Sequence, residues 1–473
     1  MRRCGTFNTV QNGVPGKASQ NGLYTFQVAF GDLRGLNHVA LGIRKTASAL
    51  LVRIVKSQGE SQVYCSMQER PDSQGVEHTS GPDANFLTHL LSNQILLQLQ
   101  RQHVVPDLTT VDSVWKAILV AALQVSNDVT TLCIHCKRPL GVTVARPIAC
   151  SAECQKGYDT WPLETRMAPL LRDPSVLDLL LTCLTAQLRA HTIGPSVPRR
   201  YFGALPPLID LPYPLDNMLD IINSFPPLVP GITFEQLIHY GNGSSNQKCV
   251  VLRWLCSKFQ GMIVPSTPSD TVAFTLPLRS PGETTQSSFV LMNGQPEVQS
   301  KFEQQLKDDY HEQQGGIAAF HGTPPHNIFN IICNGLNQNK VSGGNVYYSR
   351  EPAVSIFYTW RALTPEQSRI IAEGWSNSQF KGHSVLLGVE VAKPGIFYGP
   401  DHETNSHQDT VMVRHVFVLP PGVEETYRDL YGHEYWIQDE QIRWRMENTF
   451  RRIHDGRLLA EVSADRVERS PLN

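Results

Sequence analysis

Hydrophobic residues recur at helical spacing in three segments of the first half of the chain. In residues 86–99, one helical stripe collects the apolar side chains Phe86, Leu87, Leu90, Leu91, Ile95 and Leu99. Residues 112–123 form a second apolar run that opens with Asp112, a residue type favoured at helix N-caps. Residues 176–188 form a third run, which Asp178 interrupts and which is too short to span a bilayer. We expect three buried helices here.

Strand patterns are concentrated in the second half of the chain. Residues 384–391 and 410–419 are apolar or alternating over the length of one strand each. Residues 345–349 predict a further strand with tyrosine at its centre. Residues 40–54 fit either a strand or a helix, and residues 301–313 fit an amphipathic helix. Separate helical and strand segments of this kind predict an α+β protein.

The length of 473 residues suits two or three domains rather than one. Hydrophobic residues make up 41% of the chain and charged residues 18%, which is a globular and not a disordered composition. Changes in pattern divide the chain into an N-terminal region of α/β or α+β type, a helical region that opens with cysteines, a connector, a third region rich in strands, and a charged C-terminal extension. We place these regions at 1–130, 131–265, 266–310, 311–420 and 421–473.

Charge and cysteine content restrict the partners and the compartment. The 41 basic and 43 acidic residues give a formal net charge of −2, so no general excess of positive charge is available to neutralise phosphates. Nucleic acid is therefore not an expected partner. The first 25 residues lack the apolar core of a signal peptide, and ten cysteines in a chain of this length indicate a reducing compartment. We expect a cytoplasmic or nuclear protein that does not associate with membranes.

Four of the cysteines have the spacing of metal ligands. Cys133 and Cys136 are separated by two residues, and Cys150 and Cys154 by three, with thirteen residues between the pairs. Two close pairs of thiols can converge on one tetrahedral Zn²⁺ ion, and a site of four thiolates leaves no position for a reacting water. The spacing therefore predicts a structural zinc site. The alternative is four reduced cysteines that cluster without a metal.

A second constellation lies in the third region. Phe320, His321 and Gly322 end a predicted strand, and a pair of prolines then opens a helix that Gly335 ends. The strand at residues 345–349 follows. The tyrosine Tyr347 lies in this strand, Ser355 follows it by eight residues and Tyr358 by eleven.

This order of residues resembles the catalytic domain of the poly(ADP-ribose) polymerase superfamily. His321-Gly322 is similar to its His-Gly motif, residues 346–349 are similar to its tyrosine strand, and Ser355 and Tyr358 have the family spacing. The cysteine cluster and several upstream segments resemble the divergent mono-ADP-ribosyltransferase branch, which includes fungal members and glutamate-lacking animal relatives. The resemblance covers roughly residues 131–419. It implies split antiparallel sheets with flanking helices.

The resemblance also implies a reaction. An enzyme of this kind cleaves the nicotinamide–ribose bond of NAD⁺ and transfers one ADP-ribose unit to a protein acceptor. By resemblance, His321 binds a ribose, the backbone of Gly322 and the hydroxyl of Ser355 hold the carboxamide, Tyr358 stacks on nicotinamide and Tyr347 lines the pocket. The transition state is similar to the oxocarbenium ion of glycoside hydrolysis, so positioning and electrostatics carry most of the rate.

The third catalytic position of the family has two candidates here. Counting back from Arg414 in the last predicted strand, the matching position falls on His402, with Glu403 next to it. Glu403 would activate the acceptor, whereas His402 would place the chain with the glutamate-lacking relatives. Glu434 ranks lower because it lies well beyond this strand.

A different class of function competes with the enzyme. The chain is then an inactive ADP-ribosyltransferase-fold protein that acts as a zinc-stabilised interaction module. This reading is favoured if His321, Ser355 and Tyr358 do not converge, or if the side chain of Tyr348 or Arg350 fills the nicotinamide pocket.

Overall fold

The chain forms two compact units, Met1–Arg172 with Ala460–Asn473, and Asp173–Leu459. The computed structural model describes residues 8–9, 22–30, 33, 36–45, 47–57, 60–69, 85–103, 111–141, 143–193, 210–241, 243–266, 287–308, 315–336, 345–359, 363–393, 403–421, 423 and 436–464. Both units combine helices with an antiparallel sheet, so the predicted α+β class is confirmed.

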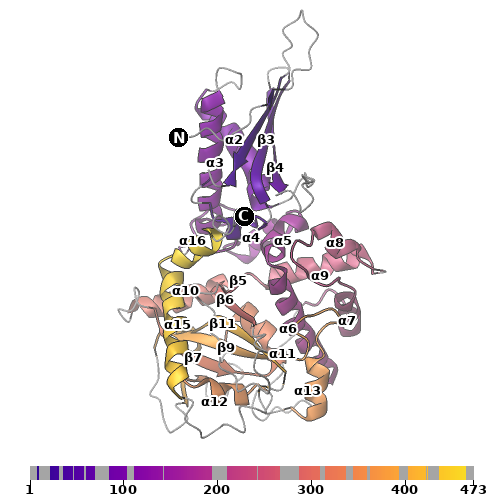
Figure 1. Cartoon of the computed structure of the whole chain (residues 1–473), viewed down its shortest axis with the longest axis vertical. Coiled ribbons are helices and arrows are strands. Elements are labelled where there is room, and N and C mark those ends of the chain that lie inside the picture. The colour runs from indigo at the N-terminus through magenta and orange to yellow at the C-terminus, as the bar shows by residue number, and fades with distance from the viewer. Residues whose placement is uncertain are drawn as a thin grey trace, which may run out of the picture. The chain divides into compact units, whose positions relative to one another are not determined.

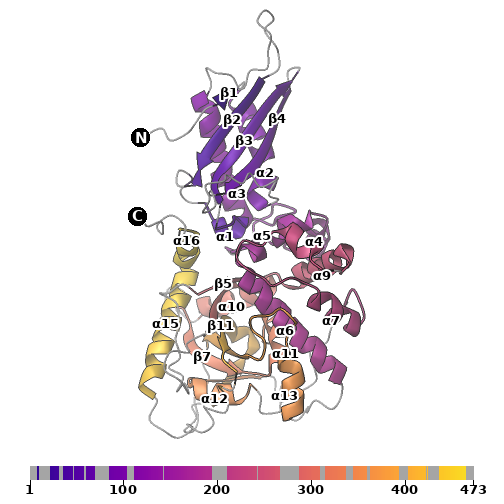
Figure 2. The ribbon, with the colours of Figure 1, turned by 45° about the vertical axis from the view of Figure 1, so that its right-hand side comes forward.

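The first unit contains a four-stranded antiparallel sheet in the order of the sequence (Figure 2). Its strands are β1 Asn8–Thr9, β2 Gly22–Ala29, β3 Ala47–Ser57 and β4 Glu60–Glu69. In β3, Leu50, Val52 and Ile54 are fully buried, whereas Arg53 between them is exposed. This alternation is that of a sheet with one face in a core and the other in water. The ambiguous segment at residues 40–54 is thus largely a strand.

Helices cover the buried face of this sheet (Figures 1 and 2). The covering helices are α2 Phe86–Arg101 and α3 Val111–Thr131, and the shorter helices α1 His38–Leu41, α4 Ala152–Asp159 and α5 Leu163–Arg172 lie at the end of the sheet (Figures 1 and 2). Asn85 and Thr88 form a capping box at the start of α2. The helices predicted at residues 86–99 and 112–123 are confirmed, although α3 is longer and Asp112 lies inside its first turn.

The second unit contains a seven-stranded antiparallel sheet in the order β10-β8-β7-β9-β11-β6-β5. The strands are β5 Met262–Pro265, β6 Ser287–Asn293, β7 Ile317–Gly322, β8 Asn345–Ser349, β9 Ser384–Val391, β10 Glu403–His407 and β11 Val411–Leu419. The strands predicted at residues 345–349 and 384–391 match, and β11 begins one residue after the predicted start. The expectation of a connector over 266–310 needs correction, because β6 pairs with β11 inside the sheet and a helix follows it.

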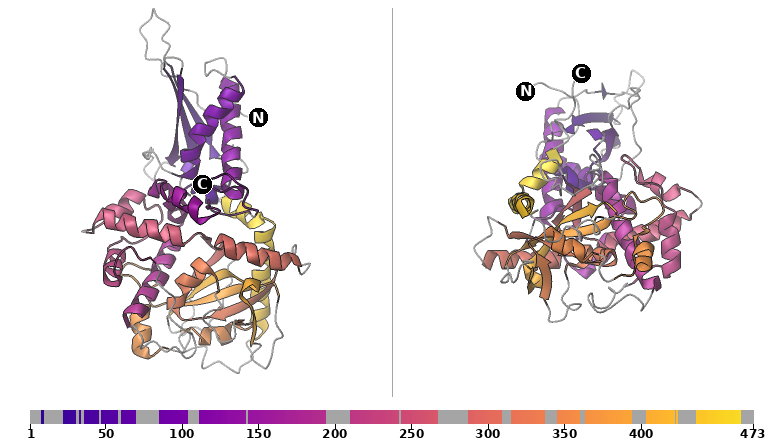
Figure 3. Two further views of the ribbon diagram at one scale, coloured as in Figure 1. Left: turned by 180° about the vertical axis from the view of Figure 1, so that it is seen from behind. Right: turned by 60° about the horizontal axis from the view of Figure 1, so that its bottom comes forward.

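Helices lie on both faces of this larger sheet (Figures 1 and 3). The helices of this unit are α6 Pro174–Ile193, α7 Leu215–Asn223, α8 Phe234–His239, α9 Ser245–Lys258, α10 Pro296–Asp308, α11 Pro325–Asn334, α12 Pro352–Phe357, α13 Pro365–Ala372, the 3₁₀ turn η4 Gln408–Thr410 and α15 Trp436–His454. The last helix, α16 Arg457–Ala464, crosses the boundary between the two units at Leu459 and Ala460. The apolar run at residues 176–188 lies in α6, which is buried over most of its length. None of the described helices is long and apolar enough to cross a membrane.

Candidate functional site

The four clustered cysteines of the first unit converge in space. All four Sγ atoms lie within 4.8 Å of one another. The Sγ atom of Cys150 is 3.5 Å from that of Cys136 and 3.7 Å from that of Cys154. Tetrahedral coordination with Zn–S bonds of about 2.3 Å requires sulfur–sulfur distances of about 3.8 Å. These four thiols can therefore hold one tetrahedral metal ion.

Backbone N–H groups donate hydrogen bonds to Cys133, the most buried thiol of the cluster, and favour its thiolate form. The N–H groups of Cys136 and Cys150 donate to the Sγ atom of Cys133 at 3.5 and 3.3 Å. Burial opposes the charged form, but these and neighbouring N–H groups lower the pKa of Cys133 to about 6. Burial and the adjacent sulfurs raise the pKa of Cys150 to about 12. A divalent cation is the group that would let several of these thiols ionise together.

The histidine between the first two cysteines does not join the cluster. The group of convergent ligand atoms contains the four cysteines without His135. The His135 ring instead lies on Gly157 of α4, where an added Cβ would be 2.2 Å from its Cε1 atom. Since α4 also carries Cys154, this contact joins the two halves of the cluster. Ser151 caps that helix by accepting the N–H of Cys154 at 3.2 Å.

The second constellation is built at the end of β7. The Nδ1 atom of His321 is 2.7 Å from the carbonyl oxygen of Tyr347 in β8. A carbonyl only accepts, so Nδ1 carries the proton and Nε2 keeps a free lone pair for a further partner. Burial lowers the pKa of His321 below its ordinary value, and the Tyr347 carbonyl opposes this effect. The imidazole is therefore neutral at physiological pH.

Gly322 allows α12 to approach β7 closely. A Cβ added at this glycine would lie 1.6 Å from the carbonyl oxygen of Ser355. Because the clashing atom belongs to the backbone, no side-chain rotation relieves it. The hydroxyl of Ser355 donates to the carbonyl of Phe320 at 2.9 Å and retains lone pairs that can accept a hydrogen bond. The structure thus brings His321, Gly322, Tyr347 and Ser355 together.

The tyrosines of β8 have different environments. The Tyr347 side chain is 49% exposed, whereas Tyr348 is buried. The Tyr348 hydroxyl is 2.7 Å from Ser406 Oγ, and Ser406 donates onward to the carbonyl of Lys393 at 2.8 Å. Successive strand residues point to opposite faces of a sheet, so Tyr348 lies on the face away from Tyr347. Tyr358 follows α12, and its ring meets that of Phe357 edge-on at 5.8 Å.

One candidate for the third catalytic position, Glu403, lies in the edge strand β10. Glu403 begins this strand and pairs in register with Ser349, two residues after Tyr347 in β8. His402 and Glu434 lie outside the described residues. The choice between His402 and Glu403 therefore stays a prediction.

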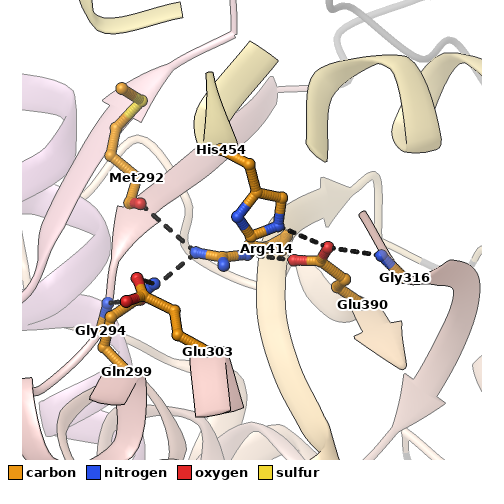
Figure 4. Close-up of polar contacts among 8 residues, drawn as sticks. All are labelled: Met292, Gly294, Gln299, Glu303, Gly316, Glu390, Arg414 and His454. Carbon is orange, nitrogen blue, oxygen red and sulfur yellow. Dashed lines mark hydrogen bonds and ion pairs between the residues drawn. The ribbon is translucent and has the colours of Figure 1, made fainter. Parts of the chain in front are cut away.

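A buried charged network in the same unit was missed by the sequence interpretation (Figure 4). Arg414 Nε donates to Glu390 Oε2 at 2.7 Å, and both side chains are fully buried. The other oxygen of Glu390 lies 2.7 Å from His454 Nε2 and accepts the N–H of Gly316 at 2.8 Å. Burial would raise the pKa of Glu390, but Arg414, His454 and the Gly316 N–H lower it to about 2.

This network joins five elements of the second unit, β6, α10, β9, β11 and α15. Arg414 also donates to the carbonyl of Met292 in β6 at 3.3 Å and to Gln299 Oε1 in α10 at 3.4 Å. Its guanidinium lies over the Phe302 ring at 5.6 Å from the centroid. The signal in the sequence was one charged residue in each of two otherwise apolar strands, because buried charges in such strands need each other.

No model of a known protein family matches the chain, and no curated protein matches it in sequence. Any assignment of function therefore depends on the residues and on the geometry described above.

Proposed function

We propose that the second unit is an NAD⁺ ADP-ribosyltransferase that transfers a single ADP-ribose unit to protein acceptors and releases nicotinamide. The observation that carries this proposal is the junction of β7, β8 and α12. There the His321–Tyr347 contact and the close approach of Gly322 to Ser355 join the four residues that resemble the family's NAD⁺ pocket. The α+β architecture with antiparallel strands is compatible with the fold that the resemblance implies.

Each residue has a role that its described environment allows. The free Nε2 of His321 accepts or donates no bond within the described chain, and we assign it to a ribose hydroxyl. The lone pairs of Ser355 Oγ accept an N–H of the carboxamide, and the backbone of Gly322 holds the same group. Tyr358 supplies a face for the nicotinamide ring, and Tyr347 lines the entrance. Tyr348 leaves this pocket open, because its hydroxyl is bonded to Ser406 on the other face of β8.

The reaction breaks the bond between C1 of the ribose and the nicotinamide nitrogen. Nicotinamide leaves with the bonding electrons as a neutral molecule, and an acceptor oxygen, nitrogen or sulfur forms a new bond to C1 and loses its proton. Glu403 would take this proton if its carboxylate reaches the pocket; His402 is the alternative. Whichever of the two residues fills this position, we propose that transfer stops after one unit, as in the mono-ADP-ribosyltransferase branch that the sequence resembles.

We also propose that the cysteine cluster binds one structural Zn²⁺ ion. Cys133, Cys136, Cys150 and Cys154 would each supply one thiolate, which completes a tetrahedral shell without an open position. The ion would hold the loop before α4 to the end of α3, and would take no part in chemistry.

Nicotinamide release from NAD⁺ by the full chain tests the enzymatic proposal. The His321→Ala variant is expected to lose at least about tenfold in kcat/KM because it loses the hydrogen bond that positions the ribose. His239→Ala is the matched control, since His239 is exposed on α8. Unchanged release in a folded His321→Ala protein would contradict the assignment.

A second pair of variants tests whether the close approach of Gly322 to the backbone of Ser355 is needed for nicotinamide release. Gly322→Ala is expected to abolish turnover because its methyl group meets the backbone of Ser355. Gly294→Ala is the control, since its methyl group meets only the movable end of Met412. If the folded wild-type chain neither releases nor binds nicotinamide, the inactive interaction module replaces the enzyme as the better description.

A further inference from the structure

The long helix α15 makes hydrogen bonds to β7 and to the residue that follows β8, the two strands that carry the proposed pocket. Arg443 Nη1 donates to the carbonyl oxygen of Arg350 at 2.8 Å. The N–H of Ala318 donates to Glu447 Oε1 at 3.1 Å. Arg350 comes three residues after Tyr347 at the end of β8, and Ala318 comes three residues before His321 in β7. One helix thus bonds to the backbone of β7 and to the backbone of the residue directly after β8.

The strands themselves do little to fix their separation. Among the described residues, β7 and β8 pair at one position, Phe320 with Ser349. By contrast, β7 pairs with β9 over six successive residues, and β8 pairs with β10 over five. A long ladder sets the distance between two strands, but a single pair leaves the angle and the separation to other contacts.

Apolar packing fixes α15 against this part of the sheet. Ile442, Met446 and Phe450 of the helix belong to one buried cluster with residues of β7, α12, β9 and β11, namely Ala318, Phe320, Ile356, Leu386, Phe417 and Leu419. Arg443 and Glu447 lie beside these side chains and one turn apart. The helix is therefore a rigid support from which the two polar side chains reach the strands.

We infer that α15 is a positioning element of the site, in which Arg443 and Glu447 set the separation of β7 and β8. They hold the Tyr347 carbonyl within hydrogen-bond distance of His321 Nδ1, and so orient the imidazole toward substrate. Neither residue touches substrate, so both are positioning residues. The expected effect on kinetics rests on the proposed function. The claim that Arg443 and Glu447 hold β7 and β8 in place does not depend on that function.

Kinetics of nicotinamide release test the catalytic consequence. Arg443→Ala and Glu447→Ala in the full chain should each lower kcat by roughly tenfold to a hundredfold, since small misplacements of catalytic groups have effects of that size. The KM for NAD⁺ should change less than kcat, because the hydrogen bond of Ser355 to Phe320 involves neither Arg443 nor Glu447. Arg443→Lys and Glu447→Gln keep a donor and an acceptor, and should restore most of the rate. The exposed residues Glu440 and Gln441 of the same helix give the control variants Glu440→Ala and Gln441→Ala.

Amide hydrogen exchange on the same proteins provides a test that does not depend on activity. Arg443→Ala should accelerate exchange at the end of β8, and Glu447→Ala should accelerate it at Ala318, while the controls match wild type. Wild-type exchange and kcat in both alanine variants would overturn the inference, as would equal losses in the alanine and conservative variants. A wild-type chain without turnover would refute the proposed function alone, and exchange would then decide the inference.

Discussion

At the scale of single residues, the second unit depends on one carboxylate. Glu390 is fully buried, yet its oxygens are bonded to Arg414, His454 and the N–H of Gly316. A buried ion pair of this kind adds little compared with apolar residues, but removal of one partner leaves a charge without compensation. The network therefore fixes the arrangement of β9, β11 and α15 more than it adds to total stability.

This reasoning predicts how the network responds to substitution. Glu390→Gln should lower the free energy of unfolding of the second unit by about 3–5 kcal/mol, because the Arg414 charge stays buried. The double variant Glu390→Gln with Arg414→Met should lose less than the single variant, since both charges are then absent. Glu373→Gln is the matched control, because its pair with Arg189 is partly exposed and should be worth less than about 1 kcal/mol. Urea unfolding at pH 7 measures all three, and equal losses in single and double variants would contradict the argument.

The Glu390 carboxylate also makes the free energy of unfolding depend on pH in the acid range. The pKa of Glu390 is lowered from 4.5 to about 2 in the folded chain, so the folded state binds the proton more weakly than the unfolded state. The stabilisation is thus fully present above pH 4.5 and is lost as the pH falls from 4.5 toward 2. The Glu390→Gln variant lacks this carboxylate. Its free energy of unfolding, measured by urea unfolding at several pH values, should therefore not show the fall between pH 4.5 and 2 that the wild-type chain shows.

At the scale of elements, α4 and the loop before it depend on the cysteine cluster. The loop between Cys136 and Cys150 contains no strand ladder among the described residues: it has one isolated bridge, Leu132 with Pro139, and a few further backbone hydrogen bonds, such as those of Leu140 and Val144 to the end of α3. A metal ion that joins Cys133 to Cys154 would thus replace the hydrogen bonds that a longer strand pair would supply.

Metal analysis tests this dependence. We expect one Zn²⁺ per chain, lost in the Cys133→Ser variant and retained in Cys183→Ser, since Cys183 is a buried thiol outside the cluster. Gly157→Val should weaken zinc binding without removing a ligand, because its side chain displaces His135 from α4. Zinc content is measured after exposure to a graded chelator. A purified wild-type chain that binds no zinc under reducing conditions would refute the site.

The elements also show how far the sequence alone could lead. The strand at residues 384–391 and the helix at 86–99 were predictable because apolar spacing and caps are local signals. The strand β6 was missed because its seven residues lie between long polar stretches, and only pairing with β11 buries them. The residues of the cysteine cluster follow from spacing, and their convergence agrees with it. The support of His321 by α15 could not be predicted, since Ala318 and Glu447 are 129 residues apart.

At the scale of the whole molecule, the cysteine cluster and the buried Glu390–Arg414 network belong to different units. The cysteine cluster packs with the core that contains Phe26, Leu50 and Phe86, all of which belong to the first unit. Glu390 and Arg414 lie in the second unit, whose core around α15 is a separate cluster. Two cores without shared residues are expected to unfold as two cooperative steps, because cooperativity follows contiguous packing.

Differential scanning calorimetry of the full chain can separate these steps. A zinc chelator should lower the temperature of one transition, because a ligand that binds only the folded state stabilises that state. Glu390→Gln should lower the other transition by several degrees, since about 1 kcal/mol corresponds to about 2–4 °C in a domain of this size. With chelator and substitution together, each transition should shift by the amount that its own single change produces. A single transition that moves with either change would show instead that the units unfold as one, and that zinc in the first unit supports the proposed NAD⁺ pocket in the second.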